Sequence, residues 1–87
     1  MKVQGLEVDP MIEQEALWRM RQPGAFSATD VANMLYVVVA KYMLGIVPPE
    51  RQVEFTMRCT DRLIQREKKA GNIELHGKRQ WKWVGPR

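Results

Sequence analysis

Three breaks divide this 87-residue chain and limit what it can fold into. Pro23-Gly24, Pro48-Pro49 and Ala70-Gly71 each contain a residue that ends a helix, because proline cannot continue the helical hydrogen bonding and glycine accepts the left-handed conformation of a helix end. The stretches before and between them carry apolar residues at helical spacing. A chain of this length usually forms one domain, so we expect a single domain built on three helices.

The first two predicted helices have N-terminal caps that can be read from the sequence. Asp9-Pro10 starts one, since aspartate accepts hydrogen bonds from free N–H groups and proline fits the first turn. Ser27 and Asp30 have the spacing of a capping box and start the second. From Leu35 to Leu44 the second helix is apolar nearly all round, with Lys41 as its one charge. We expect that segment to be buried in the domain or against a second copy.

A homodimer is therefore an expected assembly. A domain this small buries a modest core, and a dimer interface would add to its stability. The residues assigned to this interface are Leu35, Val38 and Tyr42.

The end of the chain is predicted to be a β-hairpin. Residues 73–75 and 81–84 alternate apolar and polar side chains on either side of a basic turn. Its inward face would carry Ile73, Leu75, Trp81 and Trp83. The fold class expected is thus α+β and mainly helical, with three helices followed by a two-stranded hairpin. The single domain would span residues 9–84, after a loose lead-in over 1–8 and before a short tail over 85–87.

Positive charge is concentrated in the second half of the chain. The whole sequence carries +4, but Met1–Leu44 carries −1 and Gly45–Arg87 carries +5. A basic half in a small domain indicates an anionic partner, of which nucleic acid is the first candidate.

Several other classes of protein are not expected. One cysteine and one histidine provide no set of zinc ligands, and no catalytic pair, paired carboxylates or phosphate-binding glycine loop is recognisable. We expect no enzyme activity, cofactor, metal or small-molecule ligand. No apolar run approaches the roughly 18 residues of a membrane span, and no signal peptide is evident, so a cytoplasmic protein without a membrane partner is expected.

The third predicted helix carries the main functional signal. On a helical wheel Val53, Thr56, Met57, Thr60, Leu63 and Ile64 form the expected buried arc, and Phe55 and Arg66 lie at the edge of the opposite, polar side. Arg58, Arg62, Gln65 and Lys69 follow one another at intervals of 4, 3 and 4 residues on the opposite side. This row, called the basic stripe below, spans about 16 Å and holds no acidic residue. Guanidinium groups suit phosphates and guanine, and glutamine pairs with adenine, so the stripe fits the major groove of DNA.

The order of these elements resembles the winged helix-turn-helix domain of bacterial and phage regulators. The resemblance covers Asp9 to Val84 and depends on "FSATDVANML" at the start of the second helix and "TDRLIQREKKAGNIELHGKRQWKWV" from the third helix into the hairpin. It implies a third helix in the major groove and a hairpin, the wing, on the adjacent groove or backbone. The implied DNA-binding residues are Arg51, Arg58, Arg62, Gln65, Arg66, Lys69, Lys78 and Arg79. The chain departs from the family in a hydrophobic extension over Leu35–Pro49.

The expected function is that of a small transcriptional or phage- or plasmid-type regulator of duplex DNA. Two alternatives remain open. A charged stripe is also what an ordinary solvated helix surface shows, and in that case the apolar second helix and Trp18 would dock a protein partner. The same charges would equally permit RNA or non-specific nucleic-acid binding.

Overall fold

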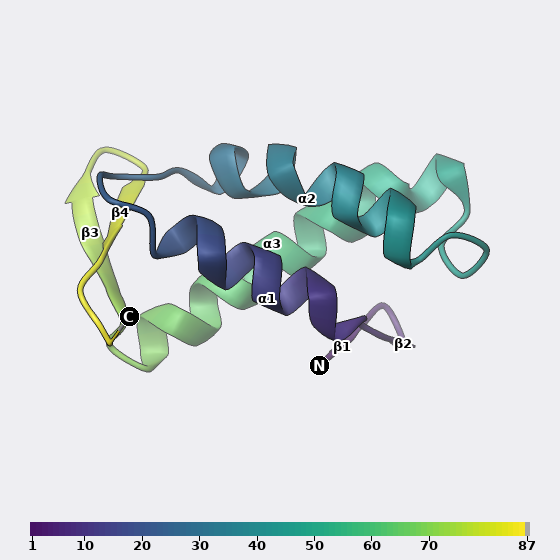
Figure 1. The fold of residues 1–87 in the computed structure, drawn as a ribbon, viewed down its shortest axis with the longest axis horizontal. Coiled ribbons are helices and arrows are strands. Elements are labelled where there is room, and N and C mark those ends of the chain that lie inside the picture. Colours follow the sequence, from purple (N-terminus) through teal and green to yellow (C-terminus); the bar gives the residue numbers. More distant parts are fainter. Residues whose placement is uncertain (87) are drawn as a thin grey trace.

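The computed structural model describes residues 1–86 and has three helices with a short hairpin near each end of the chain (Figure 1). The helices are α1 (Pro10–Met20), α2 (Ala28–Tyr42) and α3 (Gln52–Lys69), and a 3-10 turn, η1 (Pro49–Arg51), leads into α3. The strands are β1 (Lys2–Val3), β2 (Leu6–Glu7), β3 (Ile73–Gly77) and β4 (Gln80–Trp83). The predicted class, α+β and mainly helical with a C-terminal hairpin, is confirmed.

The helices pack into an elongated body of 36 × 20 × 18 Å. In Figure 1, α2 runs along one long edge, α1 lies in front, and α3 crosses behind both. One hydrophobic core joins all three: Ile12, Ala16 and Met20 come from α1, Val31, Leu35 and Val39 from α2, and Phe55, Cys59 and Leu63 from α3.

The two predicted helix caps are present. Asp9 Oδ1 accepts a hydrogen bond from the Met11 N–H at 2.9 Å. Ser27 Oγ accepts from the Asp30 N–H at 3.1 Å, and Asp30 Oδ2 accepts from the Ser27 N–H at 2.9 Å, which completes the capping box. These local bonds satisfy backbone donors that the first helical turn leaves free, so sequence alone could locate both helix starts.

Residues 1–8 are not the loose lead-in that the sequence indicated. Lys2 pairs with Glu7 and Val3 with Leu6 in an antiparallel hairpin, whose turn places Gln4 at φ 50° and Gly5 at φ 77°. Positive φ at both turn residues is the mark of a type I′ turn. Val3 and Val8 are buried in the core. The prediction was wrong because two-residue strands show too little alternation, and burial against the helices holds this hairpin in place.

The C-terminal hairpin also forms part of the domain rather than an appendage. Ile73 pairs with Trp83 and Leu75 with Trp81, and a β-bulge separates these pairs from the Gly77–Gln80 pair. A further backbone bridge joins Phe26 to Trp81, with N···O distances of 2.8 and 2.7 Å, so the hairpin is tied to the α1–α2 connection. Leu75, expected on the inward face, is 64% exposed, whereas Ile73 and Trp83 of that face are buried.

The buried side of α3 differs from the predicted arc. Thr56, Thr60, Leu63 and Ile64 are buried as expected, but Val53 and Met57 are 61% and 44% exposed. Phe55 and Cys59 are fully buried instead. The buried side is thus rotated toward Phe55, because α3 is in contact with α1 and β1 as well as α2.

The residues assigned to a dimer interface do not form a free surface. Leu35 is fully buried in the protomer's own core, and Val38 packs partly against that core. Tyr42 is the one of the three that is exposed, at 37%. Val37 and Leu44, on the same segment, are exposed at 71% and 75%.

Candidate nucleic-acid interface

The basic stripe lies on the solvent side of α3. Arg58, Arg62, Gln65 and Lys69 are all exposed. The first three line a shallow hollow, and Asp61 lines it with them. The surface around the stripe is therefore less uniformly positive than the sequence indicated. No ion pair within residues 1–86 involves Arg58, Arg62 or Lys69, so their charges face solvent.

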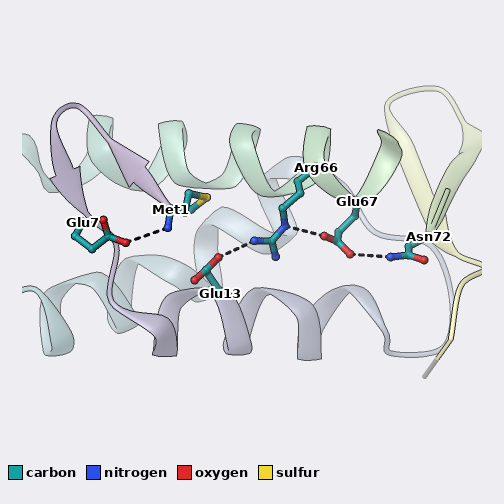
Figure 2. Close-up of polar contacts among 6 residues, drawn as sticks. All are labelled: Met1, Glu7, Glu13, Arg66, Glu67 and Asn72. Atoms are coloured by element: carbon teal, nitrogen blue, oxygen red, sulfur yellow. Dashed lines mark hydrogen bonds and ion pairs between the residues drawn. The ribbon is translucent and has the colours of Figure 1, made fainter. Parts of the chain in front are cut away.

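Arg66 is not part of this solvent-facing set, although the family resemblance nominated it. Figure 2 shows its guanidinium between two carboxylates: Nη1 donates to Glu13 Oε1 at 2.6 Å, and Nε donates to Glu67 Oε2 at 2.9 Å. Glu67 is only 6% exposed, and its second oxygen accepts from Asn72 Nδ2 at 3.0 Å. The network links α3 to α1 and to the turn before β3, so Arg66 joins elements of the fold.

The electrostatics of Arg66 agree with a structural role. Partial burial by itself lowers the pKa of the guanidinium, but the hydrogen bonds and negative charges of Glu67 and Glu13 outweigh it and raise the pKa. A guanidinium whose charge is balanced by two carboxylates attracts a phosphate less strongly than a solvent-facing one, although only two of its five N–H donors are used. The sequence could not reveal this pairing, because Glu13 lies 53 residues away in the chain.

The N-terminal hairpin borders the stripe. Arg62 Nη1 lies 3.4 Å from the carbonyl oxygen of Lys2, a weak contact that leaves most of the guanidinium in solvent. Lys2 is exposed beside it, and Gln4, exposed in the turn of the same hairpin, lines a hollow with Arg51. These two residues are a part of the surface that sequence reasoning missed, since residues 1–8 were expected to be loose.

The two basic residues of the C-terminal turn are not placed next to the stripe. Lys78 and Arg79 occupy the turn between β3 and β4, and both are exposed. In Figure 1 the hairpin crosses the end of the helices, and its turn lies far from the C-terminal end of α3 where β3 begins. Arg79 adopts φ 59°, a left-handed conformation that is strained for a residue with a side chain.

A second group of cations gathers at the hairpin end of the molecule. Arg21, just after α1, stacks over the Trp83 ring at 5.0 Å from its centroid. Lys68 of α3 lies over the Trp81 ring at 5.4 Å. Lys82 is exposed on β4 between the two tryptophans. No sequence pattern indicated these pairs, because each joins segments that are distant in the chain.

The tryptophans themselves fit the expected core role better than base stacking. Trp83 is 3% exposed and donates its indole N–H to the carbonyl oxygens of Gly85 and Pro86, both at 2.9 Å. Trp81 packs partly against the core.

Arg51 ends η1, just before α3 and seven residues before Arg58. It lines a hollow with Pro48 and Phe55 near the α2–α3 connection, where Leu6 of the N-terminal hairpin also contributes. Eighteen residues separate it from Lys69, which corresponds to about 27 Å along a helix. One groove of DNA would therefore have to follow the whole length of α3 to meet both.

Other reactive groups do not assemble into a site. Burial raises the pKa of the Cys59 thiol to about 11, with a smaller contribution from Glu13. Residues 1–86 contain no cluster of side chains suited to a metal ion, and no helix among them is long and apolar enough to cross a membrane.

Comparison with protein-family models, with curated proteins and with solved structures finds no match to this chain. The chemistry of its own surface is therefore the basis for interpreting its function.

Proposed function

We propose that this protein binds duplex DNA through the basic stripe of α3 and acts as a small regulator of the winged helix-turn-helix type. The observation that carries the proposal is the row of long, solvent-facing polar side chains on one helix, Arg58, Arg62, Gln65 and Lys69. A rigid helix supports all four, so they can engage a groove without ordering a loop.

The dimensions of the stripe suit the major groove. An α-helix fits a groove about 12 Å wide, and a stripe of about 16 Å covers several base pairs. Arg62, in the middle, is the candidate for reading a guanine edge, and Gln65 is the candidate for an adenine. Arg58 and Lys69, at the two ends, would meet phosphates. Asp61 in the same hollow favours a cytosine amino group over a phosphate and would add selectivity.

The hairpin end would supply a second, backbone-directed contact. Lys78 and Arg79 project from a turn, where flexible charge attracts phosphate but gives little sequence readout. The bridge between Phe26 and Trp81 supports this role, because it fixes the hairpin to the helical body. Arg66 is left out of the proposed interface because its guanidinium is already paired.

The experiments below also distinguish DNA binding from two other functions. A protein-interaction module would use the exposed apolar side chains and would leave the basic stripe as ordinary solvated surface. A general nucleic-acid binder would use the same cations without reading bases.

Affinity for random duplex DNA, measured across a salt series, distinguishes a DNA-binding protein from a protein-interaction module. Binding should fall linearly on a plot of log affinity against log salt, with a slope of about −0.9 for each phosphate neutralised. Lys78→Ala should reduce that slope by roughly one, whereas Lys41→Ala, which removes an exposed charge from α2, should leave it unchanged. No measurable binding at low salt would overturn the proposal.

Selection of a preferred sequence from a random pool tests base readout. Arg62→Ala should cost about 1–3 kcal/mol on the selected site and relax the preference at one position. If Arg62→Ala weakens selected and random duplexes equally, α3 makes backbone contacts only. The protein would then be a general nucleic-acid binder rather than a sequence-specific regulator.

A further inference from the structure

The N-terminal hairpin packs along one flank of α3. Arg62 Nη1 lies 3.4 Å from the carbonyl oxygen of Lys2, and Leu6 lines a hollow together with Phe55. Phe55 and Arg62 are seven residues apart and so lie on the same side of the helix. Two separate contacts therefore place the hairpin on this side of α3, which we call the hairpin flank.

Lys2 points outward from a hairpin that is held in place by the core. Val3 is buried, and successive side chains of a strand point to opposite faces, so Lys2 faces away from the core and is exposed. No ion pair within residues 1–86 involves Lys2. Its cross-strand partner, Glu7, accepts a hydrogen bond from the Met1 ammonium at 3.1 Å (Figure 2). The charge of Lys2 thus faces solvent beside the basic stripe.

The sign of the charge changes around the exposed side of α3. At about 100° per residue, the basic stripe begins with Arg62 at the hairpin flank and ends with Gln65. Glu54 and Asp61 come next around the helix, and both are exposed. Neither has an ion-pair partner in the described part of the chain. We call the side that carries these two carboxylates the acidic flank.

The width of the major groove determines what each flank of a bound helix meets. A helix with its side chains is about 10–12 Å across, and the groove is about 12 Å wide. A helix in the groove therefore fills it, and a segment packed against its flank must lie over the sugar–phosphate backbone beside the groove. A lysine is attracted to phosphates at that position, whereas carboxylates are repelled by them.

We propose that the N-terminal hairpin is part of the DNA interface and that Lys2 binds a phosphate of the strand beside the hairpin flank. This inference rests on the proposed insertion of α3 into the major groove. It also orients the helix, which is rotated in the groove toward that strand and turns its acidic flank away from it. Because the hairpin is already folded, the contact requires the ordering of one lysine side chain and no loop.

The two hairpins would contact separate phosphates. β2 leads into the start of α1, whereas Phe26, beyond the end of α1, pairs with Trp81 of β4. The N-terminal and C-terminal hairpins therefore lie at opposite ends of α1 (Figure 1). Lys2 is thus a backbone contact additional to Lys78 and Arg79.

The salt dependence of DNA binding tests the phosphate contact. Lys2→Ala should reduce the slope of log affinity against log salt by about 0.9, the change expected when one phosphate is no longer neutralised. Affinity should fall by the same factor on selected and random duplexes, because a phosphate contact carries no sequence information. Lys41→Ala is the matched control and should leave the slope unchanged. Circular dichroism should show that both variants remain folded, since both side chains are exposed.

Directed cleavage of the selected duplex tests the orientation of the helix. An iron chelate that releases hydroxyl radicals can be attached to Lys2→Cys, to Glu54→Cys or to Lys41→Cys, because the native Cys59 is buried. The Lys2→Cys conjugate should cut one strand beside the selected site, and the Glu54→Cys conjugate should cut that strand more weakly. Equal cutting by these two conjugates, or cutting by Lys2→Cys no stronger than by Lys41→Cys, would overturn the inference.

The outcomes distinguish this inference from the proposed function. If the unmodified protein binds duplex DNA but Lys2→Ala keeps the full salt slope, the hairpin contact is wrong and DNA binding by α3 stands. If the unmodified protein does not bind duplex DNA at low salt, both proposals are wrong.

Discussion

Replacing Arg66 with methionine tests whether this arginine stabilises the fold or contacts DNA. The change keeps an unbranched side chain of similar length but removes the guanidinium that holds Glu13 at 2.6 Å and Glu67 at 2.9 Å. Glu67, 6% exposed, then keeps one neutral side-chain donor, the amide of Asn72. A buried carboxylate that loses its cation destabilises the folded state.

The exposure of the participating side chains limits the loss of stability. Removing one partner of a fully buried ion pair costs about 3–5 kcal/mol, whereas an exposed pair contributes roughly 0–1 kcal/mol. The side chain of Arg66 is 43% exposed and that of Glu67 is 8% exposed, so the network lies between these limits. We expect Arg66→Met to lower the free energy of unfolding by about 2 kcal/mol, which corresponds to roughly 10 °C in Tm for a domain of this size.

Thermal and urea unfolding measure the effect, with Arg62→Met as the matched control. Arg62 has one weak carbonyl contact at 3.4 Å, so its replacement should change stability by less than about 0.5 kcal/mol. In a Glu67→Met background the further loss from Arg66→Met should shrink, because the buried charge is already gone. The reasoning is refuted if Arg66→Met unfolds like Arg62→Met. A loss of DNA affinity with unchanged stability would return Arg66 to the interface.

Three further results are expected. The Ser27 N–H lowers the pKa of Asp30, so this carboxylate contributes stability above its ordinary pKa of 3.8 that is lost as the pH falls through the lower folded value. Asp30→Asn should flatten that part of an acid unfolding curve, and an unchanged curve would count against the capping box. Arg79→Gly should stabilise the protein by about 0.5–1 kcal/mol in urea unfolding, since glycine accepts φ 59° without strain; destabilisation would mean that the turn is not strained. Cys59, buried and with its pKa raised to about 11, should react with a thiol reagent only when the domain opens, and fast labelling of the native protein would contradict its burial.

The sequence predicted the elements whose signals are local. Asp9 and Ser27 cap helices with hydrogen bonds to residues two or three positions away, and Gly71 ends α3 with φ 77°. Such interactions join residues that are close in the sequence, so the three helices and the C-terminal hairpin could be predicted without tertiary information. The exposure of the basic stripe followed in the same way, because helical spacing fixes which residues oppose a core.

The orientation of α3 and the pairing of Arg66 could be seen only in the packed structure. The direction in which α3 faces the core depends on its contacts with α1 and β1, so burial of Phe55 in place of Val53 could not be read from a helical wheel. The pairing of Arg66 with Glu13 joins residues 53 positions apart, and no local pattern records it. Helical periodicity determines which residues share one side of a helix. Which other elements pack against that side depends on how the whole chain folds around one core. This packing places Arg66 in a network that joins α1 and α3, and it leaves Val37, Leu44, Val53 and Met57 at the surface.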